Sequence, residues 1–338
     1  MRLTWDGVRV PILRTAPAVL LTAMLASGCH VLGTSASGNG NGSGSITVAV
    51  AAGIDNAPLQ VGVQDGLFQQ HGVKVTVKAY QTINAEVQAL TSGQAQIAVG
   101  DYTDFFYEQA AGRVSLRLIA DAYDAAANSV AILALPGSKI TTPQELAGQS
   151  GGVATPPAQM VPYSAAVPYN IQTLAAEEVL QNDGVSPSSV TWTPTPGPDM
   201  LGALRTRHVK AILVSEPYIL QAEEELGAVE VVDASSGVTS GLPLSGYFSL
   251  ASYAHANPSA VQAFQAALDQ AQSDCAQRGP VQAVLPRLTG MSAASASLVT
   301  LGTYPTSLNA GQVQRVATLM YDSGMITNPI NVNALITG

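Results

Sequence analysis

The stretch ITVAVAAGIDNAPLQVGVQDGLFQQHGVKVTVKA, residues 46–79, decides the class of fold. It begins with a short apolar run at 46–51, whose length and β-branched residues predict a strand. Residues 57–70 follow with the spacing of a helix that ends at His71 and Gly72, and residues 73–79 alternate as a second strand does. A strand, a helix and a strand in this order predict a βαβ unit with two parallel strands.

Strand-like and helical stretches continue to alternate beyond this unit. Further strands are expected at 95–99, 116–120, 130–135, 152–154, 190–193, 211–214 and 229–232. Helices are expected at 84–92, 102–111, 171–183, 258–278, 293–301 and 310–323. The chain is therefore expected to be an α/β protein with largely parallel sheets, in two βαβ-rich blocks followed by a helical tail.

The composition excludes several classes of protein. The chain has 338 residues, of which 47% are hydrophobic and 11% charged, so it can build a core and is not a disordered chain. Its 14 Lys and Arg against 23 Asp and Glu give a net charge of −9, which argues against nucleic acid or an anionic membrane surface as the main partner. Two cysteines are too few for a disulfide scaffold or a CxxC metal site.

The N-terminal residues have the pattern of a targeting sequence. Arg2, Arg9 and Arg14 precede an apolar run at 16–26, which is too short to span a membrane. The run ends in LASGC, where small residues lead directly into Cys29, and this segment resembles a bacterial lipobox.

That resemblance implies a signal peptide at 1–28 and a lipid on Cys29, the first residue of the mature chain. Residues 29–45 are rich in Gly, Ser and Asn, a composition typical of a flexible tether. A plain signal peptide, in which Cys29 is incidental, is the alternative. With the lipid, the chain is extracytoplasmic and held at the outer face of the cell membrane by its anchor alone.

Two common catalytic motifs, HExxH and GxxxxGK[ST], are missing from the sequence. His30, His71, His208 and His255 are scattered, without the HExxH spacing of a zinc enzyme. The phosphate-binding motif GxxxxGK[ST] does not occur. We therefore expect no enzyme activity, no cofactor and no metal site.

Several stretches, in order along the chain, have the character of a family signature. They are VGVQDGLFQQHGVKVTV (61–77), LTSGQAQIAVGDYT (90–103), LPGSKITTPQELAGQSGGVA (135–154), ALRTRHVKAILVSEPY (203–218), ANPSAVQAFQAALDQA (256–271) and LMYDSGMI (319–326). Together they resemble the SsuA-like substrate-binding lipoproteins of ABC importers, the branch for sulfonates, nitrate, taurine and thiamine-pyrimidine precursors. The chain departs from that pattern at Gln96 and Lys210, where Asp is usual, and at His208, where Gly is common.

The resemblance implies a two-lobed periplasmic-binding-protein fold of type II, with a mostly parallel sheet flanked by helices in each lobe. The chain crosses twice between the lobes, so that 46–133 and 241–338 form lobe 1 and 134–240 form lobe 2. The implied function is capture of a small solute by a monomer and its delivery to an ABC permease and ATPase. A ligand-sensing lipoprotein is one alternative. An enzyme of the thiamine-pyrimidine synthase type is another, although that branch carries a cysteine cluster that this chain lacks.

Candidate ligand-binding residues lie where strands end, because ligands of open α/β sheets bind beyond the carboxyl ends of the strands. Four such places stand out: the turn after the first strand, the turn at 100–103, the proline-rich loop 155–169 before a helix, and the SEPY segment at 215–218. The predicted site residues are Asp55, Asn56, Asp101, Tyr102, Thr155, Tyr163, Tyr169, Asn170, Glu216 and Tyr218. Helix capping by Asn56 or Asp101, and a first-turn helix acid at Glu216, are the structural alternatives.

The chemistry of these residues favours some ligands over others. The four places contain carboxylates and tyrosines but no Lys or Arg. Nearby carboxylates oppose a sulfonate or nitrate, although the free N–H groups at the start of the helix at Asn170 suit an anion. Tyrosine rings stack on planar groups and attract cations. A thiamine-pyrimidine-like, other heteroaromatic or amine ligand is therefore favoured over sulfonate or nitrate.

Overall fold

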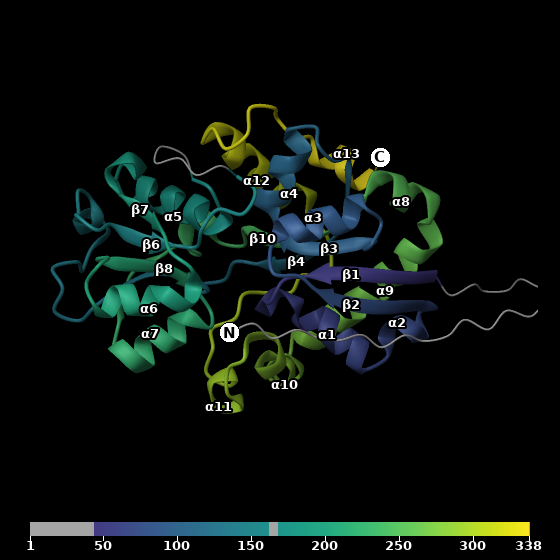
Figure 1. Ribbon diagram of the computed structural model, residues 1–338, viewed down its shortest axis with the longest axis horizontal. Coiled ribbons are helices and arrows are strands. Elements are labelled where there is room, and N and C mark those ends of the chain that lie inside the picture. Colours follow the sequence, from purple (N-terminus) through teal and green to yellow (C-terminus); the bar gives the residue numbers. More distant parts are fainter. Residues whose placement is uncertain (1–43, 162–167, 338) are drawn as a thin grey trace, which may run out of the picture. The chain divides into compact units, whose positions relative to one another are not determined.

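The computed structural model describes residues 44–161 and 168–337, and its strands form two five-stranded sheets (Figure 1). Cys29, Tyr163 and the predicted signal peptide lie outside the described residues. The last residues of the predicted tether, Gly44 and Ser45, are part of the first strand.

The first sheet contains the βαβ unit that the sequence predicts. Its strands lie in the order β2 (Val73–Ala79), β1 (Gly44–Val50), β3 (Ile97–Asp101), β10 (Pro243–Leu250) and β4 (Leu116–Asp124). β1 is parallel to β2 and β3, whereas β10 is antiparallel to both of its neighbours. The single helix predicted at 57–70 is two helices, α1 (Ala57–Gln64) and α2 (Leu67–Gln70), because Gly66 adopts a left-handed φ of 71° between them.

The second sheet repeats this arrangement. Its order is β7 (Trp192–Pro194), β6 (Val153–Thr155), β8 (Ala211–Ser215), β5 (Val130–Ala134) and β9 (Val229–Asp233). β6 is parallel to β7 and β8, and β5 is antiparallel to β8 and β9. Each sheet is therefore mostly parallel with one reversed strand, as the fold class predicted.

The chain crosses between the sheets twice, first from β4 to β5 and then back from β9 to β10. The boundary predicted at 133/134 falls inside β5. Because β5 pairs with β8 and β9, the first crossing precedes this strand and lies at 125–129. Both sheets belong to one compact unit, Asn41–Gly338.

Helices flank both sheets. The others are α3 (Ile83–Thr91), α4 (Tyr102–Ala110), α5 (Ile171–Asn182), α6 (Gly197–Arg205), α7 (Tyr218–Leu226), α8 (Ala251–Ala256), α9 (Pro258–Cys275), α10 (Arg278–Thr289), α11 (Ala293–Ala296), α12 (Ala310–Asp322) and α13 (Val332–Thr337), with 3-10 turns at Ile54–Asn56, Pro143–Leu146, Pro187–Ser189 and Gly237–Thr239. The C-terminal helices return to the first lobe, where α9 packs on α1 and α2, and α12 packs on α4 (Figure 1). The helix predicted at 293–301 ends early, at Ala296. The backbone N–H of Thr300 donates to the carboxylate of Glu216 and that of Gly302 to the hydroxyl of Tyr123, so neither continues the helix.

Aromatic rings fill the first lobe on both faces of its sheet. On one face, Phe68 of α2 stacks on Phe264 of α9 with ring centroids 5.1 Å apart. On the other face, Phe248 of β10 stacks on Phe105 at 4.3 Å. Phe248 lies on β10, the strand that follows the second crossing. The stacked pair therefore holds the returning chain against the first lobe.

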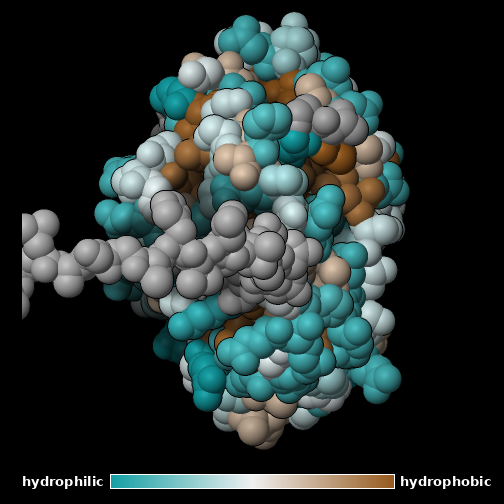
Figure 2. Space-filling model, turned by 90° about the vertical axis from the view of Figure 1, so that its right-hand side faces the viewer, coloured by the Kyte–Doolittle hydropathy of each residue, from teal (hydrophilic) through white to brown (hydrophobic). Residues whose placement is uncertain are grey.

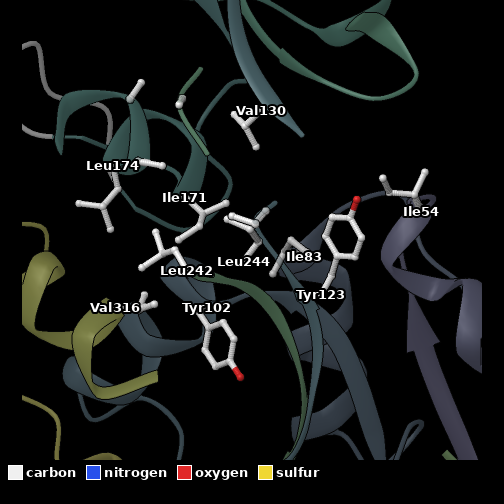
Figure 3. Packing of buried hydrophobic residues seen from close by; sticks show 14 of the residues in the cluster. Ile54, Ile83, Tyr102, Tyr123, Val130, Ile171, Leu174, Leu242, Leu244 and Val316 are labelled. Atoms are coloured by element: carbon white, nitrogen blue, oxygen red, sulfur yellow. The ribbon is translucent and has the colours of Figure 1, made fainter. Parts of the chain in front are cut away.

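One hydrophobic cluster includes residues of both lobes. Val130 and Ile171 of the second lobe belong to the same cluster as Ile83 and Leu244 of the first (Figure 3). The face of the molecule shown in Figure 2 is mostly hydrophilic, with hydrophobic residues gathered in patches. Within the described part of the chain, no helix combines the length and apolar character that a membrane span requires.

Candidate functional site

A cavity of about 380 Å³ lies at the carboxyl ends of β1, β3 and β8, where the topology of open α/β sheets places ligands. It is lined by residues 51–56, 99–101 and 215–218, together with Ile83, Tyr123, Val130, Gln159, Gln172, Leu244, Ser245, Leu288 and Thr289. Both lobes contribute, so a molecule in the cavity contacts both.

The turn after β1 brings Asp55 and Asn56 to the cavity, as the sequence predicts. Asn56 does not cap α1. Instead its Nδ2 donates to the carbonyl of Ala51 at 2.8 Å, which holds the turn closed. Burial raises the pKa of Asp55 above its ordinary value of 3.8.

The end of β3 separates two neighbouring predicted residues. Asp101 lines the cavity and makes no capping bond to α4. Tyr102 does not line it: the ring is fully buried in the first lobe and its hydroxyl donates to Asp121 at 3.0 Å. Burial, with the charges of Asp104 and Asp55, raises the pKa of Asp101 well above its ordinary value.

Three predicted residues in or next to the proline-rich loop do not reach the cavity. Thr155 and Tyr169 are fully buried and, like Asn170, do not line the cavity. Asn170 caps α5, since its Oδ1 accepts from Thr173 N at 2.8 Å, so this N–H group is not free for an anion. Tyr163, the other predicted residue of the loop, lies outside the described residues.

The SEPY segment brings Glu216 and Tyr218 to the cavity. Glu216 is also a structural link, since its Oε1 accepts from Thr300 N at 2.9 Å and its Oε2 from Leu220 N at 3.1 Å. Burial raises the pKa of Glu216, and these two backbone hydrogen bonds oppose the shift. Glu216 therefore joins the end of β8 to the segment after α11, which bridges back to β4 at Thr303.

Two further hydrogen bonds link the lobes beside the cavity. Ile83 N donates to Oε1 of Gln159 at 3.3 Å, and Met160 N donates to Oδ1 of Asp104 at 3.0 Å. Burial raises the pKa of Asp104 to about 7, and hydrogen bonds from the backbone of Met160 and Val161 oppose the shift. The first lobe thus holds the loop after β6 through the starts of α3 and α4.

Sequence reasoning missed several lining residues. Tyr123 and Ser245 come from β4 and β10, and no pattern along the chain reveals that β10 inserts between β3 and β4. Gln159 lies within the proline-rich loop, and Gln172 could have been found, because it lies in the first turn of the helix predicted after that loop.

Glu86 is the most informative residue that the sequence-based prediction of the site did not include. It is fully buried on α3, and neither of its carboxyl oxygens has a hydrogen-bond partner among the described residues. A side chain on Gly100, which lines the cavity, would lie 3.5 Å from Oε2 of Glu86, so this carboxyl lies directly behind the cavity wall. The spacing of Ile83, Glu86 and Leu90 places the acid on the apolar face of the helix, which was a usable signal.

Burial, with the charges of Asp55, Asp101 and Asp104, raises the pKa of Glu86 to about 9. The folded chain therefore holds a proton on Glu86 between its ordinary pKa of 4.5 and about 9, where the unfolded chain does not. We expect the free energy of unfolding to decrease as the pH rises through this range, and Glu86→Gln to remove that part of the decrease. Chemical denaturation at pH 6 and pH 9 measures it, and two parallel stability profiles would contradict the assignment.

Glu216→Gln is expected to destabilise the chain by about 1–3 kcal/mol, because the amide NH₂ that replaces one oxygen cannot accept from Thr300 N or Leu220 N. The control is Glu223→Gln, at an exposed position on α7, the helix that follows Glu216. Urea denaturation of both variants measures the difference. Equal stabilities would show that the two backbone bonds contribute nothing.

All charged residues that line the cavity are acidic. Asp55, Asp101 and Glu216 line it, and no Lys, Arg or His occurs among the described residues of its lining. Two buried amide oxygens beside it, Oε1 of Gln172 and Oδ1 of Asn56, have no hydrogen-bond partner in the described part of the chain. The site therefore offers mainly acceptors, which suit a ligand rich in N–H donors.

Comparison with known proteins places this arrangement in a family. The fold is similar to that of the aliphatic sulphonate binding protein SsuA from Escherichia coli, with a TM-score of 0.70 and 17% identity over 87% of this chain and 97% of that one. It is also similar to the nitrate-binding protein NrtA from Synechocystis, with a TM-score of 0.66 and 12% identity over 87% of this chain and 85% of that one.

A third similar structure is the alkanesulfonate-binding protein SsuA from Xanthomonas axonopodis bound to MOPS, with a TM-score of 0.68 and 17% identity over 86% of this chain and 97% of that one. No curated protein sequence matches the chain. Residues 40–286, which include most of both lobes and the cavity, match the NMT1-like family. The resemblance to SsuA-like binding proteins is thereby confirmed, and the chain belongs to the NMT1-like family.

Proposed function

We propose that this chain is an extracytoplasmic lipoprotein that captures a small solute between its two lobes and delivers it to an ABC importer. The lipid on Cys29, the permease and ATPase partners and the outer face of the cell membrane as its location are parts of this proposal. The observation that carries it is the cavity of about 380 Å³ at the strand ends of both lobes. Similar structures named for the binding of sulfonates and nitrate support it.

The lining favours an amine-bearing or heteroaromatic solute, such as a thiamine-pyrimidine-like molecule, over a sulfonate or nitrate. Anions would meet the carboxylates of Asp55, Asp101 and Glu216 without a basic partner in the lining. An N–H donor would meet those carboxylates and the amide oxygen of Gln172. The rings of Tyr123 and Tyr218 offer faces for a planar group.

Binding between two lobes supplies the mechanism. A solute that contacts Asp101 in one lobe and Tyr218 in the other binds the closed arrangement better than an open one and so shifts the equilibrium toward closure. A dissociation constant near 1 μM needs only about −8 kcal/mol, which a stacked ring and a few charged hydrogen bonds can provide. An importer recognises the closed surface.

A thermal-shift panel tests the proposal directly. The chain is heated with sulfonates, nitrate, thiamine pyrimidines, other heteroaromatics and simple amines. A true solute at 100 times its dissociation constant adds about 2.7 kcal/mol, which raises the Tm by a few degrees. A rise with rings or amines supports the proposal, whereas a rise with sulfonates or nitrate alone removes the ligand class and leaves solute capture in place. No rise with any compound in a broad panel would contradict capture itself.

A further inference from the structure

Four carboxyl groups meet at one wall of the cavity. Asp55 and Asp101 line it, Glu86 lies behind Gly100, and Asp104 lies in the first turn of α4. Glu86 on α3 is therefore faced by one acid from the turn after β1, one from the end of β3 and one from α4. Neither of the two ion pairs in the described part of the chain involves these groups, since they join Arg113 to Glu108 and Arg205 to Glu225.

Such a cluster cannot be fully ionised. A buried carboxylate without a hydrogen-bond or charge partner costs several kcal/mol, so the group takes up a proton instead. Glu86 meets both conditions, because it is fully buried and both its oxygens lack a partner among the described residues. The raised pKa values of Glu86 and Asp101 agree with this geometry.

We propose that Glu86 determines the charge of the ligand that the cavity accepts, by holding a proton while the cavity is empty and releasing it when a cation binds. This inference rests on the proposed solute-binding function and deepens it. The ligand cation contacts Asp101 and Asp55, its charge stabilises a carboxylate on Glu86 behind the wall, and the O–H bond of Glu86 breaks. The proton passes to the buffer, so one positive charge enters the site and one leaves it.

The exchange has a measurable signature. Below the pH at which Glu86 ionises in the empty chain, raising the pH by one unit lowers the apparent dissociation constant of a cation by up to tenfold. A neutral ligand of the same shape shows no such dependence. An anion gains nothing from the exchange, because it would have to bind beside carboxylates.

Calorimetry of the full chain with three probes on one ring tests the proposal: benzylamine, benzyl alcohol and benzenesulfonate. Titrations at pH 7 in phosphate and in Tris, whose heats of ionisation differ, count the protons released. We expect about one proton for each benzylamine bound and none for benzyl alcohol. In Glu86→Gln, benzylamine should bind about 100-fold more weakly than in the parent at pH 8, only about twofold more weakly at pH 6, and with about one proton fewer released.

The matched control is Glu177→Gln. Glu177 is a largely buried carboxyl on α5 that accepts from Nε1 of Trp192 at 2.8 Å and does not line the cavity. This variant should release as many protons as the parent chain.

Benzylamine binding without proton release would overturn the proposal, as would tighter binding of benzenesulfonate than of benzylamine. If none of the three probes binds, the thermal-shift panel decides the proposed function separately, and a carboxyl ¹³C titration of Glu86 in the free chain still decides whether Glu86 holds a proton in the empty cavity. Titration near the ordinary value of 4.5 overturns the inference, and titration above pH 7 supports it.

Discussion

Asp101→Asn is expected to weaken the binding of a cationic solute about 100-fold while leaving the fold intact. Asp101 ends β3 at the cavity and makes no capping bond to α4, so its carboxyl is available to a ligand. Removing the charged partner of a desolvated pair costs about 2–5 kcal/mol, and each 1.4 kcal/mol is a factor of ten in affinity. Calorimetric titration with the amine that gives the largest thermal shift measures the loss.

The control for this prediction is Asp199→Asn, an exposed acid in the first turn of α6 that does not line the cavity. It should bind the amine as the parent chain does. If Asp101→Asn and Asp199→Asn bind equally well, Asp101 has no contact with the solute and the ligand lies elsewhere.

Phe248→Ala is expected to lower the free energy of unfolding by about 3–5 kcal/mol, the usual cost of deleting a fully buried aromatic ring. The ring stacks on Phe105 at 4.3 Å and packs edge-on against Tyr102 and Phe106 at 5.5 and 6.2 Å. No other ring replaces it on β10 at this face of the sheet, so the cavity left behind exposes three aromatic neighbours. Chemical denaturation of the variant and the parent chain measures the loss.

The matched control is Tyr321→Ala, because Tyr321 on α12 is a ring that is 46% exposed. Its loss should change stability far less. A small effect of Phe248→Ala, comparable to that of Tyr321→Ala, would show that the returning strand is not fixed by these rings.

The first two strands of the first lobe could be predicted closely from the sequence, whereas β10 was not predicted as a strand. β2 has the predicted bounds, and β1 starts two residues earlier and ends one residue earlier than predicted, because apolar and β-branched residues in a short run indicate a strand better than they indicate its ends. Pairing between distant strands has no such local signal. The insertion of β10 between β3 and β4 depends on contacts across more than a hundred residues, and with it the position of Ser245.

The candidate site was predictable where a residue lies at, or a few residues after, the carboxyl end of a strand. Asp55, Asp101 and Glu216 reached the cavity for that reason. Tyr102 did not, because the turn from β3 into α4 carries its ring into the core beside Phe248. Asn170, which follows the proline-rich loop, did not reach the cavity either, because its side chain caps α5.

Glu86 shows a different limit. Its helical spacing indicates a buried position, but a single acid on an apolar helix face says nothing about which other acids it will meet. Only the fold brings Asp55, Asp101 and Asp104 from three other segments to the same wall. The charge preference of the cavity is therefore a property of the folded chain.

Hydrogen–deuterium exchange with and without the solute that gives the largest thermal shift tests the central claim most directly. If the solute binds between the lobes, exchange slows both at the turn after β1, near Asp55, and at the end of β8, near Glu216. These two segments lie in different sheets, so joint protection requires contact with both lobes. Protection confined to one lobe, or found only outside the cavity, would contradict solute capture at this site.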